Sequence, residues 1–130
     1  MSLSVPLKMV EQAERGSVAE QDFVAVIRES LPRAWDLVEG LAGRLRAEGG
    51  DLASYGNGPM DEETRGQLLR MLAGTAIRRA TERHFGAQLL FQNCHNVAVV
   101  PAGGEMSPEA LEFTSIESQI LNQRPDLVAC

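Results

Sequence analysis

The spacing of apolar residues predicts a chain made mainly of amphipathic helices. In residues 17–31, Phe23, Val26 and Ile27 recur at the three- and four-residue steps of one helical face, which Ser30 or Leu31 continues. Ser17 and Glu20 stand three residues apart, as in a capping box, so this helix is predicted to begin at Ser17. Residues 1–16 form a separate N-terminal segment in this prediction, or a short helix that ends at Gly16.

A second helix is predicted between Pro32 and the pair Gly49-Gly50. Proline suits the first helical turn, where its missing N–H is not needed, and glycine is common just past a helix end. One face of this segment is apolar and consists of Trp35, Val38, Leu41, Ala42 and Leu45. Trp35, the only tryptophan, is expected to anchor the core. Residues 49–60 have no periodicity and many turn formers, so a plain loop is predicted there.

The longest periodic segment runs from Asp61 to Phe85. Asp61 is predicted to cap it, and two glutamates follow in the first turn, where the helix dipole favours acids. Its apolar face consists of Leu69, Leu72, Ala73, Ala76, Ile77 and Ala80. We therefore predict one long helix that ends at Gly86, with Gly74 as a weak point in its interior.

Two apolar runs, Leu89–Phe91 and Val97–Val100, predict the strands of a β-hairpin whose polar tip is Asn93–Asn96. Because neither run alternates with polar residues, we expect burial on both faces of the hairpin. A lone hairpin is marginally stable in water, so it is expected to pack on the helices.

Residues 108–123 follow a Ser107-Pro108 start and predict a last helix, although Phe113–Ile116 would also suit a short extended stretch. The predicted fold is a helix-dominated α+β domain over residues 17–130. In it, four to five helices pack around one antiparallel β-hairpin.

Composition and charge narrow the classes of function. The chain has 130 residues, of which 44% are hydrophobic and 23% charged, as in an ordinary globular domain. It has no apolar run of the roughly 20 residues that span a bilayer, and no basic region followed by an apolar leader. A cytoplasmic protein without a membrane partner is therefore expected. The net charge of −6 argues against general binding of polyanions.

The candidate catalytic residues lie at or near the hairpin tip. Cys94 and His95 are neighbours there, and His84 ends the preceding helix. A thiolate nucleophile needs a nearby base, so a small enzyme or ligand-binding site is one hypothesis. No protease or oxidoreductase signature surrounds Cys94, and a structural cysteine is favoured. The spacing of these residues and Cys130 fits no common zinc module, so neither a metal nor a cofactor is predicted. His84 shares a helical face with buried positions and is expected to be partly buried.

Arginines are the other candidates, because the densest cationic cluster precedes the hairpin: Arg65, Arg70, Arg78, Arg79 and Arg83. Helices followed by a hairpin have the coarse order of a winged helix-turn-helix, with Arg70, Arg78 and Arg79 as candidate nucleic-acid contacts. Two features count against this alternative. The connection before Asp61 is longer than the turn of that motif, and at 100° per residue the arginines spread around a single helix.

Two segments, Arg65–Arg70 and Phe91–Val99, resemble small uncharacterised proteins of high-GC actinobacteria, over residues 31–121. The resemblance implies no activity, ligand or site. The preferred hypothesis is a non-enzymatic cytoplasmic interaction or regulatory module with a protein partner, or self-associated as a homodimer. Amphipathic helices and open hairpin edges suit such contacts. The enzyme and the DNA-binding protein remain alternatives.

Overall fold

The structure, a computed structural model, describes residues 2–56, 58–92 and 96–123. These residues form seven helices and three strands, and the helix-dominated α+β class is confirmed. The helices are α1 (Leu7–Glu14), α2 (Glu20–Ser30), α3 (Pro32–Glu48), α4 (Glu62–Ala73), α5 (Thr75–Phe85), α6 (Pro108–Phe113) and α7 (Ile116–Leu121). The strands are β1 (Ala53–Ser54), β2 (Ala87–Gln92) and β3 (Asn96–Pro101).

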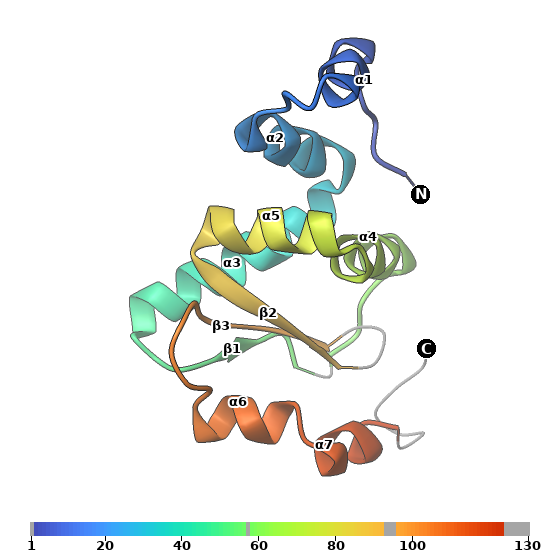
Figure 1. The fold of residues 1–130 in the computed structure, drawn as a ribbon. Helices are drawn as coiled ribbons and strands as arrows, with labels where there is room; N and C mark the ends of the chain where they lie inside the picture. Colours follow the sequence, from blue (N-terminus) through green and yellow to red (C-terminus); the bar gives the residue numbers. More distant parts are fainter. Residues whose placement is uncertain (1, 57, 93–95, 124–130) are drawn as a thin grey trace.

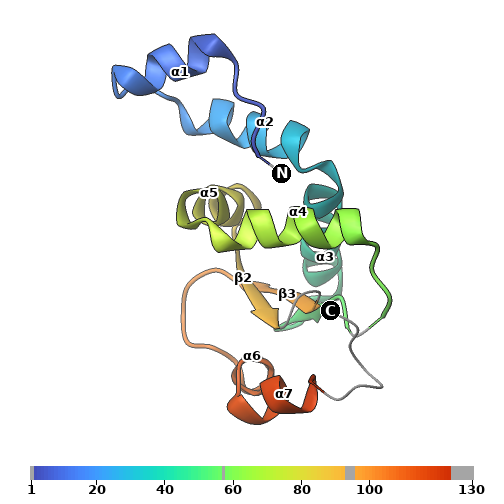
Figure 2. The same ribbon diagram turned by 90° about the vertical axis from the view of Figure 1, so that its right-hand side faces the viewer.

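A small antiparallel sheet of order β1-β3-β2 separates two helical layers. Helices α3, α4 and α5 cover one face, whereas α6 and α7 lie on the other (Figures 1 and 2). Side chains alternate between the two cores, because successive strand residues point to opposite faces. Leu89, Val97 and Val99 join the larger core, while Leu90 and Ala98 join the smaller one under α6. The predicted burial of the hairpin on both faces is confirmed for β3.

The N-terminal segment contributes little to the core. The predicted short helix before Gly16 is confirmed as α1, which has no buried residue, whereas α2 buries Val26 and Ile27. The predicted capping box is wrong. Helix α2 begins at Glu20 without a side-chain cap, and the Ser17 hydroxyl donates instead to the carbonyl of Gln12.

The predicted single helix over residues 61–85 is also wrong, because the chain breaks at Gly74. That residue is extended (φ −90°, ψ 118°) and is the only residue between α4 and α5. Helix α4 is seen end-on and α5 from the side in Figure 1, and the reverse holds in Figure 2, so the two helices cross steeply. The break lets Leu68 of α4 and Ile77 of α5 both reach the core under α3. A single straight helix over residues 61–85 could not place both residues in the same core.

Two further elements differ from the prediction. The loop over residues 49–60 contains β1, in which Ala53 pairs with Val99, and two residues are too few to show periodicity. The last predicted helix is divided into α6 and α7. Ser115 begins the second part, because its hydroxyl accepts from the N–H of Ser118 at 3.1 Å.

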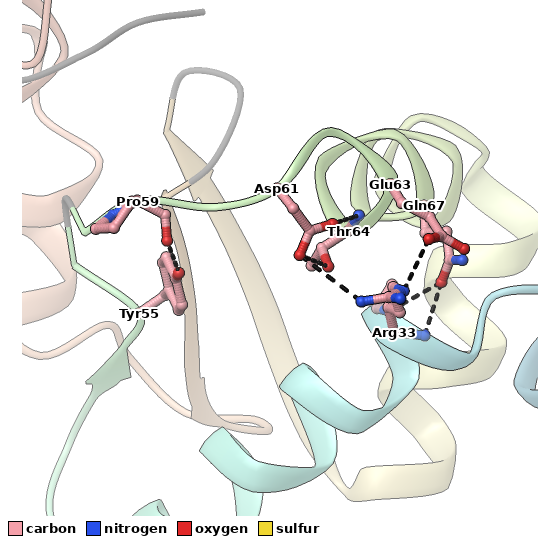
Figure 3. Close-up of polar contacts among 8 residues, drawn as sticks. Arg33, Tyr55, Pro59, Asp61, Glu63, Thr64 and Gln67 are labelled. Atoms are coloured by element: carbon pink, nitrogen blue, oxygen red, sulfur yellow. Dashed lines mark hydrogen bonds and ion pairs between the residues drawn. The ribbon is translucent and has the colours of Figure 1, made fainter.

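Helix α3 begins at Pro32 and ends at the left-handed Gly49, as predicted, but its cap comes from another helix. The carbonyl oxygen of the Gln67 side chain, in α4, accepts from the N–H groups of Arg33 (2.7 Å) and Ala34 (3.2 Å) (Figure 3). Gln67 is only 3% exposed. This contact fixes α4 against the first turn of α3. Trp35, in the same turn, is 1% exposed, which confirms it as a core anchor.

A buried set of amides closes the end of the hairpin next to residues 93–95. The Gln92 side-chain oxygen accepts from the amides of Asn96 (3.0 Å) and Asn122, while its amide nitrogen donates to the carbonyl of Phe113. The Asn96 oxygen accepts from the N–H of Gly56 at 3.1 Å. Asn96, predicted as part of the turn, is therefore the first residue of β3. The set ties the hairpin to the chain after β1 and to the end of α7.

Asp61 caps α4 as predicted. Its two carboxylate oxygens accept from the N–H (2.8 Å) and the hydroxyl (3.0 Å) of Thr64, and Arg33 lies 3.8 Å away (Figure 3). The backbone and side-chain hydrogen bonds from Thr64, helped by the charge of Arg33, hold the pKa of Asp61 below its usual value. Arg33 also pairs with Glu63 at 3.0 Å, so it draws the start of α4 toward α3.

Asp61→Asn is expected to remove a pH-dependent part of the stability. Because the pKa is lower in the folded state, ionised Asp61 stabilises the fold above its unfolded pKa of about 4, and this contribution disappears as the pH falls through the folded pKa. Asparagine keeps an acceptor but does not titrate. Thermal melts between pH 7 and pH 3 should show the wild-type advantage shrinking below about pH 4. An advantage that is constant over this range would contradict the prediction.

Candidate nucleic-acid interface

Helix α5 has one face in the core and one face in solvent. Ile77, Ala80 and Thr81 are buried. The opposite face is exposed or half-buried and consists of Thr75, Ala76, Arg78, Arg79, Glu82 and Arg83. At 100° per residue these six positions cover a continuous arc of about 160°. Three arginines thus share one side of α5. The predicted dispersal concerned five arginines on one helix; Arg65 and Arg70 belong to α4, and the three arginines of α5 lie within an arc of about 140°.

A groove of about 740 Å³ runs between α4, α5 and β2, and we call it the arginine groove. Its walls are the last turns of α4, the exposed face of α5 and the outer edge of β2. Its charged residues are Arg78, Arg79, Glu82 and Arg83, and its apolar ones include Leu69, Leu72, Leu90 and Phe91. Three arginines against one glutamate make the arginine groove cationic in a chain whose net charge is −6.

The outer edge of β2 forms one wall of the arginine groove. In the described sheet, β2 pairs only with β3, so its other side carries backbone groups that face away from the sheet. One of them, the N–H of Leu89, donates to the carboxylate of Glu82 at 2.8 Å. The single acid of the groove is therefore engaged with the strand but keeps its charge, and the groove stays cationic because arginines outnumber acids among its lining residues.

Two arginines have a distinctive setting. The Nε of Arg78 is buried, and no described residue accepts its hydrogen bond. A buried donor without an acceptor costs on the order of 1–3 kcal/mol, so the position of Arg78 Nε lowers the stability of the fold. Arg70 lies at the α4–α5 junction, where its guanidinium would come within 3.3 Å of a Cβ added at Gly74.

The structure brings together only some of the residues that the sequence indicated. Arg78 and Arg79 line the arginine groove, whereas Arg70 is not one of its lining residues and has its guanidinium beside Gly74. Arg83 was not among the candidate contacts; its four-residue spacing from Arg79 becomes informative only once α5 is known to start at Thr75. Cys94, His95 and Cys130 lie outside the described residues, so the Cys/His hypothesis stays a prediction.

His84 differs from its predicted setting. It is exposed, although its ring packs against the rings of Trp35 (centroids 5.0 Å apart) and Phe85 (4.9 Å). Its helix ends one residue later, so the positions that would cover it are absent from α5. Within residues 2–56, 58–92 and 96–123, no group of three metal-ligating side chains comes together. In the same ranges, no helix is long and apolar enough to cross a bilayer.

The described residues define a small α+β domain in which a steeply crossed helix pair leads directly into an antiparallel hairpin, with a cationic groove beside the second helix. The chain belongs to the NucS shadow ORF family, whose model matches residues 1–130. The name of this family states no biochemical activity. Comparisons with curated proteins and with solved structures found no significant match.

Proposed function

We propose that the protein is a cytoplasmic regulatory module that binds double-stranded DNA through α5, in the manner of a winged helix-turn-helix. The observation that carries this proposal is the arrangement of elements. In chain order they are α3, β1, α4, α5, β2 and β3, and the sheet order is β1-β3-β2. Helices α4 and α5 supply the helix pair, and β2 with β3 supplies the wing.

Two features of the sequence count against DNA binding: the long connection before Asp61 and the spread of the arginines around one helix. The arrangement of elements removes both objections. The long connection before Asp61 lies between α3 and α4 and carries β1; it is not the turn of the motif. That turn is Gly74, and a short turn with glycine is typical of a helix-turn-helix. Arg65 and Arg70 belong to α4, and the remaining Arg78, Arg79 and Arg83 lie within an arc of about 140° on α5.

The chemistry of that side suits a duplex. The second helix of such a pair enters the major groove, which is wide enough for an α-helix. A guanidinium can donate two parallel hydrogen bonds to a phosphate or to the major-groove edge of guanine. Arg79 is exposed on the arc of α5 between Thr75 and Arg83, so it is the residue that we expect to reach the DNA most directly.

The test is fluorescence anisotropy of a labelled 20-base-pair duplex titrated with the full chain. We expect saturable binding at about 50 mM salt that weakens steeply by about 200 mM. Three arginine–phosphate contacts predict a log–log salt slope of about −3, since each neutralised phosphate contributes about −0.9. A single-stranded 20-mer is the control and should bind more weakly. Lack of binding to the duplex at low salt would end the proposal.

A second candidate function, self-association as a homodimer, has its own support. The exposed large apolar residues include four on the α6–α7 layer: Leu111, Ile116, Ile120 and Leu121. Ile116, at the start of α7, is 74% exposed. Several exposed large apolar side chains on neighbouring helices are common at contacts between proteins. Helix α6 contributes Ala110 to the smaller core, so the layer is attached to the sheet while its outer side faces solvent.

The double variant Ile116→Lys, Ile120→Lys is expected to convert a dimer to a monomer in sedimentation equilibrium, because it places two charges in the α6–α7 surface. Leu7→Lys, at an equally exposed apolar position of α1, is the matched control and should leave the mass unchanged. A wild-type protein that is monomeric at 100 μM or so would rule out self-association of ordinary strength.

A further inference from the structure

Helix α2 reaches the arginine groove through its first residue. Glu20 and Arg83 form an ion pair in which Nε of Arg83 donates to Oε1 of Glu20 at 2.7 Å, and one terminal nitrogen of the guanidinium donates to the same oxygen. The hydrogen bond from Arg83 holds the pKa of Glu20 below its usual value, and Glu20 raises that of Arg83. Helix α2 lies over α5 on the side away from the sheet (Figure 1).

This ion pair occupies the donors that a nucleic acid would use. Nε and a terminal nitrogen form the edge of a guanidinium that binds a phosphate with two hydrogen bonds. On Arg83 that edge is turned to a carboxylate of the same chain. One of the three arginines in the groove is therefore neutralised by α2.

The contact is also easy to release. The side chain of Arg83 is 59% exposed and that of Glu20 is 47% exposed, and ion pairs in such settings contribute little to stability. Within the described residues, α1 buries no side chain and α2 buries only Val26 and Ile27. Helix α2 itself stays packed through Ile27, with Phe23 and Val24 against the core, so only the Glu20 side chain at its start is easily displaced.

We propose that α2 is an autoinhibitory element for the arginine groove, in which Glu20 takes the place of a DNA phosphate on Arg83. The inference rests on the proposed DNA binding and adds its regulation. Binding of DNA releases Arg83 from Glu20, and any event that moves the Glu20 side chain away from Arg83 increases the affinity for DNA.

The test compares two variants that remove one negative charge from the same helix. Asp22 is exposed, forms no ion pair within the described residues, and lies about 200° around α2 from Glu20. In the anisotropy titration with the 20-base-pair duplex, Glu20→Gln should bind about 3- to 10-fold more tightly than wild type. Its salt slope should stay near the wild-type value of about −3, because Arg83 contacts a phosphate in both proteins once Glu20 has been displaced. Asp22→Asn should change the affinity less than about twofold, through general charge only.

The outcomes separate this inference from the proposed function. If wild type binds the duplex and the two variants have equal affinities, the autoinhibition is overturned while DNA binding stands. If no variant binds at low salt, both are overturned. In an Arg83→Ala background, Glu20→Gln should change the affinity for the duplex no more than Asp22→Asn does. This result would show that the higher affinity of Glu20→Gln depends on the ion pair with Arg83. Circular dichroism of each variant checks that the fold is retained.

Discussion

Arg79→Ala weakens the binding of duplex DNA by about 5- to 150-fold, which is the largest effect that we expect on function. Arg79 is exposed, lines the arginine groove and lies on the same face of α5 as Arg78 and Arg83. Loss of one arginine contact to a base or a phosphate is worth about 1–3 kcal/mol, and 1.4 kcal/mol is a factor of ten. If Arg79 binds a phosphate, the log–log salt slope also becomes shallower by about one.

The matched control for this variant is Arg15→Ala. Arg15 is an exposed arginine at the end of α1, outside the arginine groove, so its loss changes the net charge by the same amount. Its effect on affinity should stay below about twofold, as expected for a screened charge. Equal losses for Arg79→Ala and Arg15→Ala would mean that arginines anywhere on the surface attract DNA to the same extent and that α5 does not enter the major groove of DNA.

Gln67→Leu lowers the free energy of unfolding by about 2 kcal/mol, which is the largest effect that we expect on stability. Leucine has a similar volume to glutamine but no acceptor, so the N–H groups of Arg33 and Ala34 lose their partner. The bond to Ala34 is buried, and a buried N–H left without an acceptor costs about 1–3 kcal/mol. Urea denaturation followed by circular dichroism measures the change.

Two variants control for this result. Gln67→Glu keeps an oxygen that can accept from the first turn of α3, and its carboxylate is favoured at a helix N-terminus, so it should be less destabilising than Gln67→Leu. Gln21→Leu makes the same substitution at an exposed position of α2 and should change the stability by less than about 0.5 kcal/mol. If Gln67→Leu is as mild as Gln21→Leu, the cap on α3 does not matter for stability.

The candidate site was only partly predictable from sequence. Arg78 and Arg79 stand out as cations near a hairpin, and a winged helix-turn-helix is one interpretation of the order of elements. The spacing of the arginines argued against it, because a helix that starts at Asp61 places them on several faces. Gly74 alone could not reveal the break, since a single glycine is often tolerated inside a helix. Glu82 and Glu20, which pair with Leu89 and Arg83, come from contacts that no local pattern contains.

By itself, the sequence determined the local features of this protein. The Asp61 cap, the Pro32 start, the glycine ends at Gly49 and Gly86, and the apolar strands β2 and β3 each depend on neighbours within a few residues. Only the tertiary structure decided where α4 turns into α5, that β1 joins the sheet, and that Gln67 caps α3. These features depend on burial against distant segments, which outweighs local propensity. The arginine groove and the ion pair between Glu20 and Arg83 exist because packing of α5 on α2, α4 and β2 sets the direction in which its exposed face points.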